Sequence, residues 1–311
     1  MSGPRVSIVT ATYNRSRVLR HTIASVIGQR FSDWELIVVG DACTDDTSAT
    51  VASFADGRIR YHALDVNVGE QSGPNNVGVS MSRGELIAFL NHDDLWFSDH
   101  LELLVAAMER TGADLVFSLS AAMIPDRPPI LCGFTPSGRY EPRTFAPASS
   151  WVLNRTLAER TGGWRSSREC YQAPSQDWLY RARRTGADAR LVPSLTVLAV
   201  PSGYRRGSYA SSDDSENAGY AARMADPLFR ERLLTDIALG QASGDPYAPG
   251  TTAVLPYLSR AAKNAAIAAL SYAGAPPASI RMFLRSRRRG HLIDALRQVR
   301  GLPALSRERT K

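Results

Sequence analysis

Apolar runs of strand length alternate, over the first third of the chain, with segments in which apolar residues recur every three or four positions. Strands are predicted at the start of 5–15 and at 35–39, 59–62 and 86–90, and helices at 18–29, 48–54 and 77–82. Because strand and helix alternate, the sequence predicts an α/β fold whose sheet is largely parallel and whose crossover connections are right-handed.

Acidic side chains follow two of these predicted strands. The strand 86–90 runs directly into Asn-His-Asp-Asp at 91–94, and the strand 35–39 ends two residues before Asp41. In an open α/β sheet ligands bind outside the carboxyl ends of the strands, so these acids are expected to line one crevice. Adjacent carboxylates repel each other unless solvent or a cation screens them. A solvated loop is the simpler interpretation of one acidic pair, whereas their recurrence at strand ends favours a nucleotide-type site.

Several pieces of the sequence, taken in order and with their spacing, carry a family resemblance. They are residues 6–15, 36–47, 67–69, Asn76 and 84–94, followed by 161–164 and 176–178. Over about residues 4–206 the chain resembles a family 2 glycosyltransferase of the GT-A (nucleotide-diphospho-sugar transferase) fold. Members of this family move a sugar from a nucleoside-diphosphate donor to an acceptor hydroxyl, with inversion at the anomeric carbon. The resemblance implies a mostly parallel, Rossmann-like sheet flanked by helices, a nucleotide-sugar donor, and a saccharide, glycolipid or other hydroxyl acceptor.

The resemblance also implies a divalent metal ion, Mn²⁺ or Mg²⁺, at the end of the strand 86–90. Asp93 matches the second acid of the family's DxD motif, and Asp94 is the other predicted ligand. A cation held by carboxylates would stabilise the negative charge that develops on the leaving diphosphate. The first motif position is Asn91, which supplies no charge but can hydrogen-bond a ribose hydroxyl. His92 is expected to be a spacer.

The remaining donor contacts come from the same resemblance. The predicted donor-binding residues are Thr12, Tyr13, Arg15, Asp41, Asn76, Asn91, Arg205 and Arg206. Tyr13 would stack on the nucleoside or hydrogen-bond it, and Arg15 would reach a phosphate. A basic loop at the place of Arg205 and Arg206 often closes over the diphosphate. Where the family commonly has two consecutive acids this chain has Gly40 and Asp41; a UDP-sugar is favoured, with a dTDP-sugar as the rival.

Inversion in a single displacement requires a base next to the attacking hydroxyl, and Asp177 is the predicted catalytic base. The structural alternative is that Ser175 caps a helix with Asp177 in its first turn. The predicted acceptor-binding residues are Gly163, Trp164 and Trp178. Aromatic faces pack well on sugar rings, but a turn that carries a core tryptophan explains Trp164 equally well.

The net charge of +7 is concentrated near the C-terminus, where residues 280–311 hold ten basic and two acidic residues. No DNA- or RNA-binding motif accompanies this tail, so nucleic acid is not expected as a partner. The tail has the pattern of a basic amphipathic helix, which suits peripheral contact with an anionic membrane. The alternative is a helix that packs on the catalytic domain.

We expect a catalytic domain over 1–207, with a nucleotide-binding half at about 1–95 and an acceptor half at about 96–207. A helical C-terminal region would follow over 208–311. No apolar run reaches the roughly 18 residues of a spanning helix, and no secretory leader precedes the first strand. The three cysteines lack metal-ligand spacing. These features predict a cytoplasmic protein, with or without peripheral contact to the inner face of the membrane.

Two other functions remain compatible with the sequence. A non-catalytic relative that binds a nucleotide-sugar or acts as a scaffold is supported by the departures from the family at Gly40, Asn91 and Gln176. A sugar-phosphate nucleotidyltransferase is disfavoured, because such enzymes usually have a glycine-rich phosphate loop with a lysine near the N-terminus, and this chain has no lysine before Lys263.

Overall fold

The computed structural model describes residues 3–242, 265, 269 and 289–305. The strands are β1 (Val6–Thr12), β2 (Trp34–Gly40), β3 (Ile59–Ala63), β4 (Leu86–Phe89), β5 (Leu95–Trp96), β6 (Leu115–Ala122), β7 (Ile130–Cys132), β8 (Trp151–Asn154) and β9 (Ala189–Ala199). The helices are α1 (Ser16–Ile27), α2 (Thr47–Ala52), α3 (Ser72–Met81), α4 (His100–Thr111), α5 (Arg155–Thr161), α6 (Pro174–Arg184), α7 (Ser215–Met224), α8 (Phe229–Ala242) and α11 (His291–Arg300), with the short 3-10 helices η1 (Ala148–Ser150) and η2 (Ser202–Tyr204).

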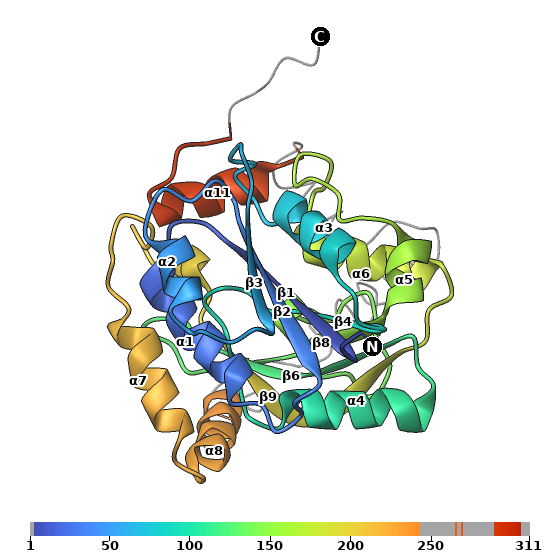
Figure 1. The fold of residues 1–311 in the computed structure, drawn as a ribbon. Helices are drawn as coiled ribbons and strands as arrows, with labels where there is room; N and C mark the ends of the chain where they lie inside the picture. The colour runs from blue at the N-terminus through green and yellow to red at the C-terminus, as the bar shows by residue number, and fades with distance from the viewer. Residues whose placement is uncertain (1–2, 243–264, 266–268, 270–288, 306–311) are drawn as a thin grey trace.

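The strands form one sheet in the order β3-β2-β1-β4-β8-β6-β9-β5, with β7 paired to β6. β3, β2, β1 and β4 are mutually parallel, as are β6 and β9, whereas β8, β5 and β7 pair antiparallel with their neighbours. The predicted α/β fold is therefore confirmed, but the sheet is mixed: β1 to β4 pair in parallel with one another, and every antiparallel pair includes a strand of the acceptor half. Because β1, β2 and β4 run the same way, their carboxyl ends meet at one edge (Figure 1).

Alternate side chains of the central strands enter two cores on opposite faces of the sheet, as the period-two geometry of a strand requires. Ile8 and Leu86 pack with residues of α1 and α4, whereas Val9, Ile87 and Phe89 pack with residues of α5 and α6. With both faces covered, these strands consist of continuous apolar runs, which is why they were visible in the sequence.

The described elements after residue 207 are helical. Phe229, Leu233 and Ile237 of α8 pack in a third apolar cluster with Leu95 and Phe97. α11 lies away from α7 and α8, at the top of Figure 1 beside α3, and it contacts η2. The division into a catalytic domain and a C-terminal region stays a prediction. No helix in the described ranges has the length and apolar content needed to cross a bilayer.

Candidate active site

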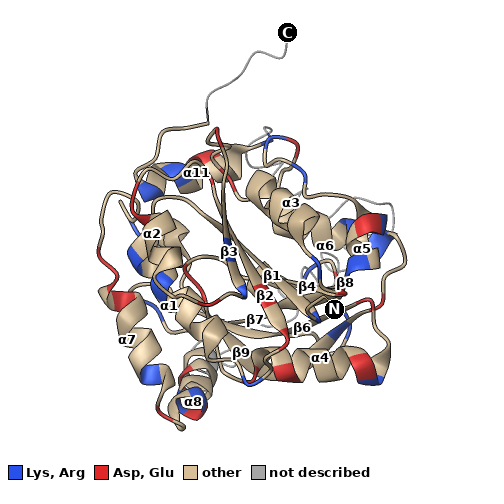
Figure 2. Ribbon diagram, viewed as in Figure 1, with Lys and Arg blue, Asp and Glu red and all other residues tan. Residues whose placement is uncertain are grey.

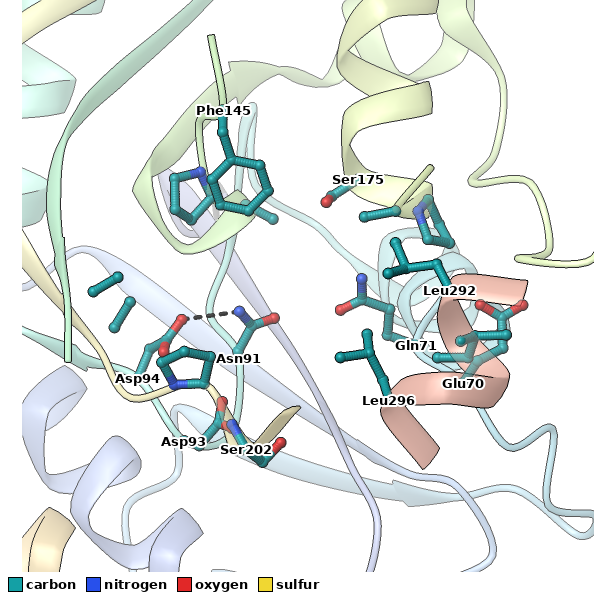
Figure 3. Close-up of a pocket in the computed structure, with 18 of the residues that line it drawn as sticks. Glu70, Gln71, Asn91, Asp93, Asp94, Phe145, Ser175, Ser202, Leu292 and Leu296 are labelled. Atoms are coloured by element: carbon teal, nitrogen blue, oxygen red, sulfur yellow. Dashed lines mark hydrogen bonds between the residues drawn. The ribbon is translucent and has the colours of Figure 1, made fainter. Parts of the chain in front are cut away.

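A cavity of about 1050 Å³ opens at the carboxyl ends of β1, β2 and β4. Residues at these strand ends form one side of it: Thr12, Tyr13, Asp41, Asn91, Asp93 and Asp94. The other sides come from the start of α6, from η2 and from α11, represented in Figure 3 by Ser175, Ser202, Leu292 and Leu296. The predicted strand-end residues are therefore brought together in one site, as the parallel topology requires.

Asp94 is fully enclosed and its carboxylate holds three segments together. One oxygen accepts hydrogen bonds from Asn91 Nδ2 (2.9 Å) and Ser149 Oγ (2.5 Å), and the other accepts one from the backbone N–H of Val200 (2.9 Å). Burial, and then the charge of Asp93, raise the pKa of Asp94 to about 7. Both oxygens accept hydrogen bonds, so this carboxylate positions the strand ends, and its role as a metal ligand stays a prediction.

Asp93 has a different environment, although it is the next residue. One carboxylate oxygen, Oδ2, accepts the backbone N–H of Ser202 at 3.0 Å, and Oδ1 accepts no hydrogen bond from any described residue. Burial acts to raise the pKa of Asp93, but the nearby His92 and Arg300 outweigh it and hold that pKa below its usual value. Asp93 is therefore a charged carboxylate with one free oxygen in the cavity.

These residues fit a divalent cation that is completed by its substrate. Among the described residues no group of three or more His, Cys, Asp and Glu side chains is arranged to hold a metal alone. Mg²⁺ and similar cations are commonly held by one or two carboxylates together with substrate phosphates and water, and Asp93 supplies such a carboxylate. Asn91 donates its amide nitrogen to Asp94, which leaves its amide oxygen on the cavity side (Figure 3).

Asp41 shapes the far end of the strand edge. Its two oxygens accept the backbone N–H groups of Val68 (2.7 Å) and Gly69 (2.8 Å), although burial still raises its pKa. Gly69 has φ +81, a conformation that favours glycine. Asp41 therefore fixes the loop that precedes α3, and direct recognition of a base by its carboxylate would require these bonds to be exchanged.

A cluster of aromatic and basic residues lies beside Asp93. The hydroxyl of Tyr209 is 3.2 Å from His92 Nε2, and His92 Nδ1 is 3.2 Å from the carbonyl of Ala11. The guanidinium carbons of Arg15 and Arg300 lie 5.5 Å and 5.6 Å from the centroid of the Tyr209 ring. Burial lowers the pKa of His92, so its neutral ring links Tyr209 to the end of β1.

Four of the predicted donor-binding residues do not line the cavity: Arg15, Asn76, Arg205 and Arg206. Arg15 is buried and donates to the carbonyl of Ser208. Arg205 is turned away, because its guanidinium pairs with Glu216 and donates to the carbonyl of Met123. Arg206 is also absent from the lining.

Asn76 is the remaining predicted donor contact outside the cavity lining, and its role stays a prediction. Its side chain accepts the backbone N–H of Trp164 at 2.7 Å and donates to the carbonyl of the same residue at 2.9 Å. The amide therefore clamps the turn after α5, and it is not part of the cavity wall.

The predicted acceptor platform belongs to the core. Trp164 packs edge-on to Phe89 with ring centroids 4.9 Å apart, and Trp178 stacks on Trp151 at 5.9 Å. Both indoles are at least 95% buried, and Gly163 is likewise outside the cavity lining. The core alternative is therefore the one observed for the two tryptophans, and acceptor binding by these three residues stays a prediction that the cavity lining does not support.

Asp177 lies one layer behind the cavity. Ser175, two residues earlier on α6, faces the cavity, and two helical steps rotate a side chain by about 200°. The carboxylate of Asp177 pairs with Arg181 at 2.9 Å and lies 3.9 Å from Arg165. Cys170 does line the cavity. Its own burial is the main cause of its raised pKa, and the negative charge of Asp177 is the second. The role of Asp177 as catalytic base stays a prediction.

The apolar stripe of the basic tail faces the cavity. Leu292, Ile293 and Leu296 of α11 line the cavity. Figure 2 shows basic positions along the same helix, and Arg297 and Arg300 are also in the lining. The alternative of a helix packed on the catalytic domain is thus observed for α11. The rest of the tail predicted to contact a membrane, 280–288 and 306–311, lies outside the described residues.

Sequence reasoning missed Tyr209 and Arg300 as site residues. Tyr209 lies in a polar loop without a motif, and Arg300 belongs to a basic amphipathic helix for which packing on the catalytic domain was only the alternative. The available signal was the apolar stripe of α11, which a helix packed over a cavity needs as much as one on a membrane does.

Residues 7–127 match the family model described as Glycosyl transferase family 2. The glucosyltransferase WfgD of Escherichia coli, named for UDP-Glc and an alpha-D-GlcNAc-diphosphoundecaprenol acceptor, is 31% identical over 112 residues, which is 36% of this chain and 44% of that protein. The poly(ribitol-phosphate) beta-N-acetylglucosaminyltransferase TarP of Staphylococcus aureus is 34% identical over 36% of this chain and 35% of its own length. The matches therefore span less than half of these relatives.

Two solved structures show the fold. TarS of S. aureus in complex with UDP-GlcNAc aligns with a TM-score of 0.56 and 18% identity over 77% of this chain and 73% of that chain. A mannosyltransferase from Pyrobaculum calidifontis, in complex with GDP-Man and Mn²⁺, aligns with a TM-score of 0.54 and 18% identity over 92% and 88%. The GT-A prediction is confirmed at the level of the fold.

Proposed function

Residues 7–127 match the model of glycosyl transferase family 2, and from that match we propose that this chain transfers a sugar from a nucleoside diphosphate to an acceptor hydroxyl. The observation that carries the proposal is the free carboxylate oxygen of Asp93 in a cavity that Arg300 also lines. A carboxylate for a cation beside a guanidinium for phosphate is the chemistry that a nucleotide-sugar needs at its diphosphate.

The donor in this proposal is a UDP-sugar. The name of WfgD includes UDP-Glc, and the TarS neighbour holds UDP-GlcNAc, whereas the mannosyltransferase neighbour holds GDP-Man. A dTDP-sugar remains the rival that the loop held by Asp41 leaves open. The acceptor would be a growing glycan or glycolipid, which is supported by relatives named for diphosphoundecaprenol and poly(ribitol-phosphate) acceptors.

The geometry divides the chemical work among named residues. Asp93 would hold Mn²⁺ or Mg²⁺, which supplies positive charge to the departing diphosphate. The amide oxygen of Asn91 would accept a ribose hydroxyl, and Tyr13 would lie against the nucleoside. Transfer with inversion requires a base for the attacking hydroxyl, and we propose Asp177 for this role, because its charge reaches Cys170 in the cavity lining.

A binding screen followed by turnover tests the proposal. The protein is melted in the presence of Mn²⁺ with UDP-Glc, UDP-GlcNAc, dTDP-rhamnose and GDP-mannose, and the best donor is then assayed for release of its nucleoside diphosphate. We expect one donor to raise the melting temperature only with the metal, and Asp93→Asn to abolish both the shift and the release.

Three outcomes would contradict the proposal. A protein whose melting no nucleotide-sugar changes has no donor site. Donor binding without turnover on any acceptor or water would favour the non-catalytic relative. Formation of a nucleotide-sugar from a sugar phosphate and a nucleoside triphosphate, with release of pyrophosphate, would favour the nucleotidyltransferase.

A further inference from the structure

α11 is attached to the cavity by bonds from both of its ends. At its C-terminal end the carbonyls of Val299 and Arg300 accept the backbone N–H groups of Gly207 (2.8 Å) and Tyr209 (3.1 Å). Just before its N-terminal end, the backbone N–H of Gly290 donates to the carbonyl of Cys170 at 3.1 Å. Because these bonds are made to the backbone, the position of the helix over the cavity is set independently of most of its side chains.

Arg297 attaches the middle of the same helix to the donor side. This buried guanidinium donates to the carbonyl of Gly69 (2.6 Å) and to that of Pro303 (2.7 Å). A Cβ at Gly69 would collide with Leu305, so the chain that follows α11 also lies directly on the loop held by Asp41. The hydrogen-bonding capacity of Arg297 is thus used to position α11.

Arg300 is one turn further on, and its guanidinium is not used in this way. Arg300 lines the cavity, and its guanidinium makes no hydrogen bond or ion pair with any residue in the described ranges. Its Nε is buried without a partner, and the guanidinium carbon lies 5.6 Å from the centroid of the Tyr209 ring. A partly buried guanidinium without an acceptor is costly, so an anion is the partner that this position lacks.

The surroundings of Arg300 determine which anion fits. Arg15 lies at the same Tyr209 ring, and its own Nε is buried without a partner among the described residues. The charge of Arg300 helps to lower the pKa of Asp93. Asp93 would take a divalent cation, so the space between it and Arg300 suits a group with several anionic oxygens. A guanidinium presents its N–H groups in a planar fork that matches two phosphate oxygens.

We propose that Arg300 binds the diphosphate of the donor, so that α11 is a part of the donor site contributed from outside the family-matched residues. This inference rests on the proposed function, because it assumes a nucleoside-diphosphate donor. It replaces Arg205 and Arg206 in the role of closing over the diphosphate, since neither lines the cavity and Arg205 is paired with Glu216. The ring of Tyr209, which both guanidinium groups approach, positions Arg15 and Arg300.

Calorimetric titration of the full chain, with Mg²⁺ present, tests the assignment. The probes are UDP, dTDP and GDP, each beside its own nucleoside, and the variants are Arg300→Gln, Arg300→Lys and Arg289→Gln. Arg289 is the matched control: it removes the same charge just before α11, it is exposed, and it is outside the cavity lining. Arg206→Gln is included as the competing assignment.

We expect Arg300→Gln to weaken the best nucleoside diphosphate by about tenfold or more, since a hydrogen bond to a charged group contributes roughly 1.5–3 kcal/mol. Its nucleoside should bind as before, because the lost contact is to phosphate. Arg300→Lys keeps the positive charge but lacks the planar pair of N–H donors, so it should bind the nucleoside diphosphate with intermediate affinity. It also provides the test if Arg300→Gln does not fold. Arg289→Gln should bind like the wild type.

Each contrary result has a distinct meaning. If the wild type binds a nucleoside diphosphate and Arg300→Gln binds it equally well, the assignment of Arg300 is wrong while the proposed function stands. The same holds if Arg300→Gln weakens nucleoside and nucleoside diphosphate alike, or if Arg206→Gln rather than Arg300→Gln loses the diphosphate. If the wild type binds none of the three nucleoside diphosphates, the proposed function itself is overturned.

Discussion

The two sides of the cavity are built from different kinds of segment. Site residues were predicted correctly from the sequence on one side more often than on the other. On the strand side, Thr12, Asp41 and Asp93 follow or end parallel strands, and all three line the cavity. On the opposite side, Trp164 and Asp177 were predicted from motifs in a turn and a helix, and both lie behind the wall.

The difference has a geometric cause. Residues that end adjacent parallel strands reach the same edge of the sheet whatever their exact register, so proximity follows from topology alone. On a helix, the direction of each side chain depends on its rotational phase, and a shift of two residues reverses it. Motifs in helices therefore need a known packing face before a role can be assigned.

Replacement of Asp93 is expected to have the largest effect and is the strongest test of the strand side. Asp93→Asn removes a carboxylate whose Oδ1 accepts no hydrogen bond from the described residues. We therefore expect transfer to fall by roughly a thousandfold, at the upper end of what a lost electrostatic contact costs. The fold should persist, because the backbone N–H of Ser202 can still donate to the amide oxygen. Turnover with saturating donor and metal is the measurement.

The neighbouring acid supplies the matched control. Asp94→Asn presents an amide nitrogen to groups that all donate, so it should lower the free energy of unfolding by about 1–3 kcal/mol. Whatever folded enzyme remains should keep its dependence on the metal. Equal losses of turnover at fixed folded fraction for the two variants would mean that both acids act on the substrate, contrary to the division of roles seen here.

A variant at Asp177 tests whether the helix side is purely structural. If this carboxylate is the base, Asp177→Asn should reduce kcat by about a hundredfold, the lower end for general base catalysis, with donor affinity unchanged. The ion pair with Arg181 complicates the interpretation, because Arg181 also donates to the carbonyls of Thr161 and Gly163.

Arg181→Gln separates the two explanations. It breaks the same ion pair but keeps the carboxylate, so it should retain most of the kcat if Asp177 is the base. If Asp177 only holds Arg181 in place, both variants will lose activity to a similar extent and will melt at similarly lowered temperatures. That result would make the contrast between the two sides of the cavity complete and would leave the base unassigned.

Much of the fold could be predicted because its signals are local. The buried strands are apolar runs and the acids after them mark their ends, so the α/β frame followed from segments of about ten residues. The GT-A fold and the site of Asp93 followed from the family resemblance of those segments. Arg300 could not be found in this way: it reaches the site only because α11 packs against η2 and the loop at Gly69, contacts that join opposite ends of the chain. Nor could a motif distinguish Asp93 from Asp94, since their partners Ser202, Ser149 and Val200 are remote in sequence.

Trp164 tests the assignment of the helix side to the core. Trp164→Phe removes ring volume without removing a hydrogen bond, because Nε1 is buried and has no partner among the described residues. We expect a loss of about 2 kcal/mol in the free energy of unfolding, within the usual range for a partial cavity. The KM for the acceptor should be unchanged. A raised KM with unaltered stability would return Trp164 to the acceptor site.

The smallest expected effect concerns His100, which lies beneath the acceptor half and takes no part in the cavity. Burial lowers its pKa to about 3, and its ring stacks on Trp96 at 4.1 Å with Nδ1 2.7 Å from Thr196 Oγ1. Between pH 6.5 and 3 the unfolded chain binds a proton that the folded chain excludes, so stability is fully present above pH 6.5 and falls as the pH drops. One proton corresponds to about 1.4 kcal/mol per pH unit.

His100→Asn keeps a donor for Thr196 and cannot titrate. In urea unfolding at pH 5 and pH 7, the free energy of unfolding of the variant should therefore fall less steeply with decreasing pH, by roughly that slope. Because the buried His92 contributes in the same direction in both proteins, only the difference between them reports on His100. Parallel pH dependence in the wild type and the variant would mean that the ring is protonated, or open to water, in the folded state, and the acceptor half would then be less tightly packed than the strand side.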